Sequence, residues 1–449
     1  MAPSAANDDQ QSGVGETDGF GGGRSPFSAS EDLSGNGMRR ATVAFIFVTV
    51  LLDVLSLGVI IPVLPTLIEE EFLGGDTARA ALYTGLFNTT WALMQFLFSP
   101  FLGALSDQFG RRKVILLSCL GLGLDYVLMA LAPNLLWLFV GRVLSGITAA
   151  SYATAGAYIA DVTPPEKRAS AYGMFGAAWG IGFVIGPAVG GFLGGYGLRI
   201  PLWVAAGLTL ANALYGFFIL PESLKPEHRS PFRWRKANPV GSLLLLRSHP
   251  ELLGLAAVLG LYQLAHQVFP SVFVLYAGHR YGWGPQLVGM TLMVVGLMGV
   301  FMQGYVVRRF APVLGERKML FIALTLGATG YVIYGLAETG WQFWAAIPVF
   351  AFVGFFSPAI QGLMTRRVGP SEQGQLQGAN SSLAGIAGML GPAIFSTVFS
   401  AGIADSSPIE LPGMPFLLAA FLHLLAILIA IRVLQRPRPD SADRSAKES

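Results

Sequence analysis

Long apolar blocks separated by short polar segments dominate the chain from about residue 40 to residue 434. Each block has roughly the 20 residues that a helix needs to cross a bilayer. We therefore predict membrane-spanning helices over 40–67, 80–104, 113–132, 135–160, 169–194, 199–220, 251–276, 285–307, 317–338, 341–364, 376–401 and 412–434. The predicted fold class is an all-α membrane protein with twelve transmembrane helices in two six-helix bundles. The chain holds 56 glycines, which in lipid favour close helix contacts.

The polar segments divide the chain further. Residues 1–37 are rich in Gly, Ser and Asp and poor in aliphatic residues, so we expect a disordered cytoplasmic tail. This segment lacks a basic region followed by an apolar core, so it does not resemble a signal peptide. The expected organisation is this tail, an N-terminal bundle, a cytoplasmic linker, a C-terminal bundle and a cytoplasmic tail, at 1–37, 38–220, 221–250, 251–434 and 435–449.

The distribution of Lys and Arg predicts the orientation in the membrane. Connections after odd-numbered spans carry only Arg79, Arg199 and Arg280. Because basic residues concentrate on the cytoplasmic side, both termini and the 221–250 linker are predicted to be cytoplasmic. The connections after even-numbered spans carry Arg111, Arg112, Lys113, Lys167, Arg168, Lys225, Arg229, Arg233, Arg235, Lys236, Arg247, Arg308, Arg309, Arg317, Lys318, Arg366 and Arg367.

The two halves share a repeat. A shift of 205 residues superposes five positions in and just before span 5 on five in and just before span 11. This offset matches Pro165, Gly173, Gly180, Gly186 and Pro187 with Pro370, Gly378, Gly385, Gly391 and Pro392. Repeats related by an axis along the membrane normal are typical of transporters that alternate access between the two sides.

Composition narrows the function classes. Hydrophobic residues make up 53% of the chain and charged residues 12%, about half the charged fraction of soluble proteins, which argues against a soluble enzyme. A net charge of +3 does not favour nucleic-acid binding. A single cysteine and five scattered histidines give no disulfide or metal-site pattern, so we expect no metal and no cofactor other than a coupling proton. Without a phosphate-loop motif, ATP drive is not expected.

Two motifs carry more specific information. The connection after span 2 contains Gly103, Asp107, Gly110, Arg111 and Arg112. Its glycines permit a tight turn, and Asp107 can pair with Arg or accept bonds from a helix N-terminus. We expect a gating loop here, the alternative being a plain basic cytoplasmic loop.

Span 5 contains the second motif, which includes Gly182, Gly186, Pro187 and Gly190. Small residues on one face permit close helix packing, and Pro187 removes a backbone donor and is expected to kink the helix. A generic packing face is the alternative to a functional motif.

These two stretches resemble the major facilitator superfamily, and the second is similar to its antiporter motif. Finer resemblance goes to the tetracycline-resistance branch of the drug/proton antiporters. It is carried by Leu51-Leu52-Asp53, Pro62 to Pro65, Ala92 to Gln95, Leu124-Asp125-Tyr126, Gly141-Arg142, Ile159-Ala-Asp161 and Glu372 to Gly378. The resemblance implies the major facilitator fold and proton-coupled efflux, and it marks Asp125 and Arg142 as functional.

The chain also departs from that branch. Its tetracycline members carry a His in span 8, four residues before a Gln, and an Asp in span 9. Here the Gln matches Gln303, but Gly299 and Gly327 stand at the His and Asp positions. This departure puts tetracycline itself in question as a substrate, although not antiport.

Three charges lie deep in the predicted spans, and we expect them to serve proton coupling. Asp53 lies 13 residues into span 1, about 20 Å from its cytoplasmic end. A carboxyl at this depth costs about 2.5–3.5 kcal/mol on insertion scales. If it ionises only when its side of a cavity opens to water, it can exchange a proton for a cationic or chelated substrate. A structural, hydrogen-bonded Asp is the alternative. The helix should bend after it, at Pro62 and Pro65.

Asp125 and Arg142 lie at similar depth on either side of the turn at Pro133, roughly 12–14 Å from the outer ends of spans 3 and 4. An ion pair between them is the hypothesis, with a functional or a purely structural role. Polar residues in membrane helices more often join helices than bind ligands, so the cavity candidates are weaker. They are Asn88, Gln95, Gln263, His266, Gln267, Gln303 and Gln361, while His423 is expected to be peripheral.

The resulting hypothesis is a multi-pass protein of the plasma membrane, in bacteria the inner membrane, that exports small amphipathic drugs or metabolites in exchange for protons. Multidrug efflux and tetracycline resistance fall within this prediction. The expected partners are the lipid bilayer and a small-molecule substrate, with no nucleic acid and a functional monomer. Two alternatives are a facilitator or proton symporter on the same fold, and a non-transporting sensor or scaffold.

Overall fold

The computed structural model describes residues 46–149, 151–231, 241–243, 245–246, 249–404 and 410–435. Within these ranges the chain forms helices, turns and loops, and no strand. The predicted tails, except Gln435, and the middle of the predicted linker lie outside the described residues. We call residues 46–220 the N-terminal half and residues 249–435 the C-terminal half.

The N-terminal half begins with the span Ile46–Phe72. Its helix is interrupted by a turn at 61–63, where Pro62 removes a backbone donor, and it continues as α2 and a short π-helix. The break expected from the prolines is therefore present. The elements are α2 (Leu64–Leu67), η1 (Ile68–Phe72), α3 (Thr77–Phe109), α4 (Arg111–Leu131), α5 (Leu135–Thr148), α6 (Ser151–Val162), η2 (Pro165–Lys167), α7 (Arg168–Gly194) and α8 (Ile200–Ile219).

The C-terminal half follows two short 3-10 turns, Pro226–His228 and Gly241–Leu243. Its seventh predicted span is interrupted at Gln267, which ends one helix and begins the next. The elements are α10 (Pro250–His266), α11 (Val268–Tyr281), α12 (Pro285–Phe301), η6 (Met302–Val307), α13 (Arg308–Leu336), α14 (Gly340–Phe350), η7 (Ala351–Phe355), α15 (Phe356–Thr365), η8 (Pro370–Glu372), α16 (Gln373–Ile403) and α17 (Met414–Gln435).

Each of the twelve predicted ranges is mainly helical where the structure describes it. Nine helical segments of the described residues are long and apolar enough to cross a membrane. One of these, Pro285–Leu336, covers two predicted spans, which the left-handed backbone of Gly315 (φ 70°) divides. Two further predicted spans, at α3 and at α5 with α6, are not among the nine. The structure establishes an all-α membrane fold, and twelve crossings stay a prediction.

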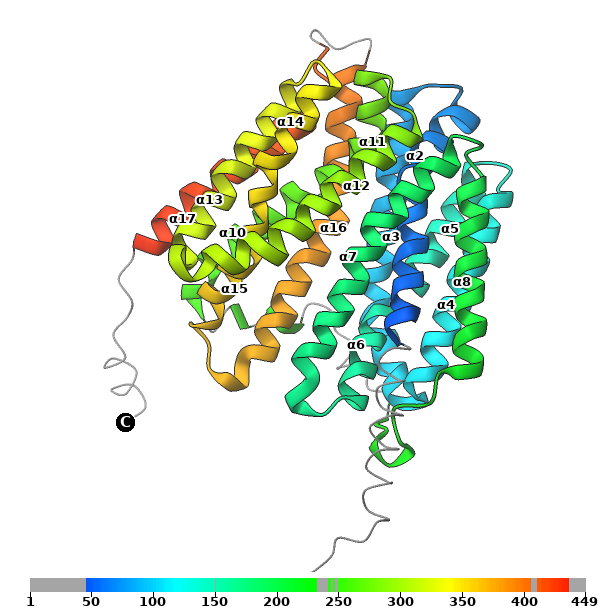
Figure 1. Cartoon of the computed structure of the whole chain (residues 1–449), viewed down its shortest axis with the longest axis vertical. Helices are drawn as coiled ribbons and strands as arrows, with labels where there is room; N and C mark the ends of the chain where they lie inside the picture. Colours follow the sequence, from blue (N-terminus) through cyan, green and yellow to red (C-terminus); the bar gives the residue numbers. More distant parts are fainter. Residues whose placement is uncertain are drawn as a thin grey trace, which may run out of the picture. The chain divides into compact units, whose positions relative to one another are not determined.

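The offset of 205 residues recurs in the structure. The turn and helix η2–α7 begin at Pro165 and Arg168, and η8–α16 begin at Pro370 and Gln373. The positive φ of Gly110 (101°) likewise recurs at Gly315. Across the two halves, α3 packs along α16, and α7 packs along α12 (Figure 1). The second helix of each half thus packs against the fifth helix of the other half, as expected for two repeats related by a pseudo-twofold axis.

The ends of the helices differ in charge. In Figure 1 the connections α6–α7 and α15–α16 lie at one end, and α11–α12 and α13–α14 at the other. The first end carries the basic connections, including Lys167, Arg168, Arg366 and Arg367, and we call it the basic end. The opposite end carries few basic residues.

Candidate functional site

A cavity of about 730 Å³ lies between the two halves. Its walls come from the first span and α3, α5 and α7 on one side, and from Gln267, α11 and α16 on the other. This volume lies within the range of drug-sized binding sites. The lining is mainly apolar, with Trp91, Phe96 and Phe183, and its neutral polar side chains include Asn88, Gln95, Gln267, Ser381 and Ser382.

The halves meet closely at the end opposite the basic end. A Cβ added to Gly191 of α7 or Gly289 of α12 would overlap backbone atoms of the other helix. Nearer the basic end, a Cβ added to Gly173 or Gly176 of α7 would meet no atom within 4 Å. The contact between α7 and α12, which we call the seam between the halves, is thus tight at the end opposite the basic end, and these two glycines nearer the basic end make no such close contact.

Arg142 is the one charged side chain among the described residues that line this cavity. It lies on α5, is 6% exposed, and its guanidinium carbon stands 5.5 Å from the centre of the Trp91 ring. Among the described residues its nitrogens make no hydrogen bond and no ion pair, and Nε is fully buried. Among the described residues, the direct contact of this buried cation is therefore an aromatic ring, and its charge also interacts at longer range with the carboxylate of Asp125.

Asp125 lies behind Arg142 on α4 and is fully buried. Its carboxylate packs against the neighbouring helix at Gly141, where an added Cβ would stand 2.8 Å from Oδ1. Among the described residues, no nitrogen of Arg142 comes within 4.0 Å of it, and no hydrogen bond reaches either carboxylate oxygen, although Ser145 is adjacent. The ion pair expected from the sequence is thus absent in this conformation, because Arg142 turns to Trp91 instead.

Asp53 lies inside the N-terminal half and outside the cavity lining. Asn212 of α8 donates a hydrogen bond to its Oδ1 at 2.9 Å, and the Cys119 thiol of α4 lies 3.8 Å from both oxygens. Asn212 also donates to the carbonyl of Thr49 at 3.0 Å. The carboxylate is 4% exposed and has no cationic partner among the described residues. The sequence alone did not indicate Cys119 or Asn212 as its partners.

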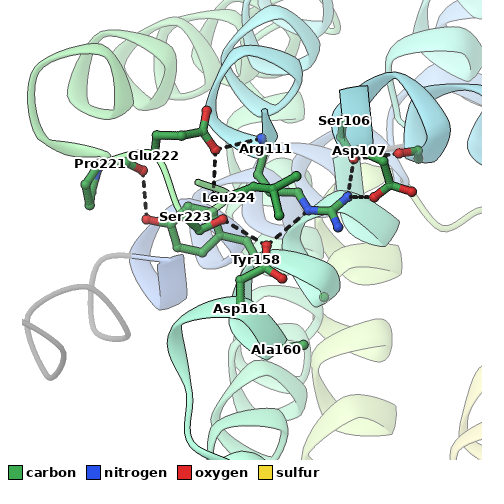
Figure 2. A network of polar contacts seen from close by, with 12 residues as sticks. Ser106, Asp107, Arg111, Tyr158, Ala160, Asp161, Pro221, Glu222, Ser223 and Leu224 are labelled. Atoms are coloured by element: carbon green, nitrogen blue, oxygen red, sulfur yellow. Dashed lines mark hydrogen bonds and ion pairs between the residues drawn. The ribbon is translucent and has the colours of Figure 1, made fainter. Parts of the chain in front are cut away.

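A polar network connects the predicted gating loop with the start of the linker (Figure 2). Arg111 binds Asp107 at 2.6 Å and Asp161 of α6 at 3.2 Å, and it donates to Ser106. The backbone N–H of Arg111, the first residue of α4, donates to Glu222 at 2.8 Å. Glu222 therefore caps this helix, whereas Asp107, for which the sequence suggested either a capping role or pairing with Arg, pairs with Arg111.

The other loop residues have separate roles. An added Cβ on Gly110 would overlap the Glu222 carboxylate, so the loop needs glycine both for its φ of 101° and for space. Arg112 donates to the carbonyl of Phe217 at 2.6 Å. The carbonyl of Gly103 accepts a hydrogen bond from the Ser106 hydroxyl at 2.7 Å. A Cβ added to Gly103 would meet no atom within 4 Å.

The repeat gives this network a counterpart of opposite polarity. A shift of 205 residues places Arg111 and Asp161 on Glu316 and Arg366, which form an ion pair of 2.8 Å. Each half therefore joins the start of its third span to the end of its fourth by one ion pair at the basic end. The acidic and basic residues exchange places between the halves. A search for the same residue types at repeat positions would therefore not find this relation.

The glycines of α7 form close contacts with the first span. An added Cβ at Gly182 would stand 2.8 Å from Val54, and one at Gly186 would stand 2.7 Å from the Cα of Gly58. A Cβ added at Gly190 would overlap the carbonyl group of Val59. Gly182 thus contacts the residue next to Asp53, while Pro187 lies against α12 at Gly289. The close packing expected from this motif is present on two sides of the helix.

Of the weaker candidates, Asn88, Gln95 and Gln267 line the cavity, whereas Gln263, His266, Gln303 and Gln361 do not. Asn88 joins the halves by donating to the carbonyl of Pro270 at 3.2 Å. Gln361 exchanges hydrogen bonds with Gln377 of α16. His266 stacks with Tyr262 and Phe350 at ring-centre distances of 5.7 and 6.2 Å.

His423 is a correction to the sequence prediction, because it is fully buried rather than peripheral. Its ring packs against Gly327, where an added Cβ would stand 2.7 Å from Nδ1, and it stacks on Tyr262 at 5.7 Å. Nδ1 lies 3.3 Å from the carbonyl of Leu324, and Nε2 has no hydrogen-bond partner in the part of the chain that the structure describes. The ring therefore fills the space left by the missing side chain at position 327.

Two repeated helical halves with a cavity between them define a polytopic membrane transporter of small molecules. The family model of the Major Facilitator Superfamily matches residues 46–392, and the chain belongs to this family. The chain is 36% identical over 379 residues to the tetracycline resistance protein, class C, of Escherichia coli, covering 84% of this chain and 93% of that protein. It is 29% identical to multidrug resistance protein 2 of Bacillus subtilis, covering 83% and 90%.

Solved structures agree with this fold. A human organic anion transporter superposes with a TM-score of 0.65 at 24% identity, covering 87% of this chain and 99% of that one. A nucleoside transporter superposes with a TM-score of 0.71 at 12% identity, covering 88% of this chain and 100% of that one. Both likenesses concern the fold alone.

Proposed function

We propose that this chain is a proton-coupled efflux antiporter for small amphipathic molecules in a bacterial inner membrane. It would work as a monomer by alternating access, with both termini in the cytoplasm. The relatives named for tetracycline resistance make tetracycline-like molecules candidate substrates. Because Gly299 and Gly327 replace the His and Asp of the tetracycline branch, transport of tetracycline itself has to be measured. The closed seam opposite the basic end fits a state open to the cytoplasm.

The observation that carries the proposal is the position of α7. One side of this helix packs at Gly182 against Val54, the residue after Asp53, and another side packs on α12 of the C-terminal half. A change at the Asp53 carboxylate can therefore bias the seam through a single helix.

The membrane potential can supply energy for such an exchange. A membrane potential of about 100 mV supplies about 2.3 kcal/mol for each elementary charge moved. This corresponds to roughly a 45-fold concentration gradient for each charge coupled. A buried carboxyl that gains and loses one proton per cycle can use this energy without ATP.

Everted vesicles energised with a proton gradient test the proposal. We expect the wild type to accumulate at least one of tetracycline, fluorescein and rhodamine 6G, and Asp53→Asn to lose this accumulation. Glu70→Gln is a matched control, because it removes a carboxylate from the exposed end of the same span. Accumulation by Asp53→Asn at the wild-type rate would contradict the proposal, and proton-stimulated movement in the opposite direction would favour a symporter.

A further inference from the structure

The charge of the central cavity has a consequence for its ligand. Arg142 is the one charged residue among its described lining residues, and the remaining polar groups there are neutral. Asp53 and Asp125 are both buried in the N-terminal half and do not line the cavity, although Asp125 lies behind Arg142 and interacts with its charge. The wall of the cavity is therefore positive, with no acid on its described surface to receive a cation.

The state of the Arg142 side chain also points to a ligand. A guanidinium that is 94% buried, with no hydrogen bond to any described residue, is costly unless an acceptor reaches it. Guanidinium groups bind planar oxyanions through two parallel N–H···O bonds. The Trp91 ring holds the group from one side and adds a flat apolar surface next to it.

We propose that the cavity binds amphipathic organic anions, with Arg142 holding a carboxylate or enolate and Trp91 contacting the adjoining ring system. This inference rests on the proposed function, since it names the substrate class of the same cavity. A volume of about 730 Å³ accommodates a drug-sized, polycyclic anion. The remainder of the ligand lies against Phe96, Phe183 and the neutral amides of Gln95 and Gln267.

Two dyes that share one xanthene skeleton test the charge preference. Fluorescein is anionic at neutral pH and rhodamine 6G is cationic, so their comparison separates charge from ring size. We expect fluorescence anisotropy with the purified wild-type protein to give a Kd for fluorescein at least tenfold lower than that for rhodamine 6G. Equal affinities, or tighter binding of rhodamine 6G, would overturn the proposal without any variant.

Three variants then assign the preference to Arg142. Arg142→Gln should abolish the preference for fluorescein, and Arg142→Lys should retain part of it, because the charge remains while the planar donor pair is lost. Arg79→Gln is the matched control, removing the same charge from an exposed site on α3 outside the cavity. An unchanged dye ratio in Arg142→Gln, with a wild-type gel-filtration profile, would refute the assignment.

The binding test is separable from the proposed function, because it needs no proton gradient. Preference for fluorescein without gradient-driven accumulation would contradict proton-coupled efflux and leave the ligand class supported. Gradient-driven accumulation of rhodamine 6G with no binding of fluorescein would contradict the proposed ligand class and leave proton-coupled efflux supported.

Discussion

Replacing Gly186 with alanine tests the close contact between α7 and the first span. The added methyl would stand 2.7 Å from the Cα of Gly58 and 3.0 Å from the carbonyl of Leu55. Ordinary contacts between carbon atoms are about 3.5–4.0 Å, so the two helices would have to separate by about 1 Å. Overpacking of this kind costs about 1–3 kcal/mol.

Gly176→Ala is the control on the same helix, because its methyl would meet no atom within 4 Å. Alanine in a helix is otherwise favoured over glycine by about 0.5–1 kcal/mol. The same substitution is thus expected to destabilise at position 186 and to be neutral or stabilising at position 176.

Thermal unfolding of the purified protein, followed by tryptophan fluorescence, measures the difference. In soluble domains of 150–250 residues, 1 kcal/mol shifts Tm by about 2–4 °C. We therefore expect Gly186→Ala to lower Tm by about 5 °C and Gly176→Ala to leave it unchanged or raise it. Equal Tm values for the two variants would refute the packing described for this motif.

Three further predictions concern other sites. Gly327→Ala should destabilise the protein by about 1–3 kcal/mol, because the methyl would stand 2.7 Å from the His423 ring; Tm measurements of this variant, His423→Ala and the double variant should give less than additive losses, and strict additivity would argue against the contact. Gly110→Ala should cost about 1–3 kcal/mol in urea or thermal unfolding, because φ is 101° and the methyl overlaps Glu222; a wild-type stability would contradict the loop geometry. Cys119 is 2% exposed, so N-ethylmaleimide should label the folded protein far more slowly than the denatured protein; mass spectrometry showing equal rates would mean that the Asp53 cluster is open.

The apolar blocks predicted the positions of the helices well, because a chain in lipid has to satisfy its backbone polar groups within each span. The break in the first span followed from Pro62, and the repeat offset of 205 residues recurs in helix starts and in positive-φ glycines. These features follow from the residue types and their spacing, so the sequence alone predicts them.

The rotation of each helix about its axis could not be predicted. Lipid-facing and core-facing positions are both apolar, so the pattern does not show which side of a span faces the cavity. The sequence therefore selected Asp53, Asp125 and Arg142 by depth, and only the structure placed Arg142 at the cavity and both acids behind it. The position of His423 beside Gly327 depends in the same way on tertiary packing.

Long-range partners were also hidden from the sequence. Glu222 caps α4 across 111 residues, and its only signal was an acid at the start of a linker. The ion pair between Glu316 and Arg366 becomes visible only when the repeat is combined with the contact between Arg111 and Asp161. Such pairs need coordinates because hydropathy and local motifs contain no distance information.

The central claim is that the Asp53 carboxylate couples proton movement to substrate export. Proteoliposomes with an internal pH indicator measure this directly, by following the proton flux that starts when substrate is added. We expect a substrate-dependent proton flux with the wild type and none with Asp53→Asn, while both proteins still bind the substrate. An equal proton flux through Asp53→Asn would contradict the claim.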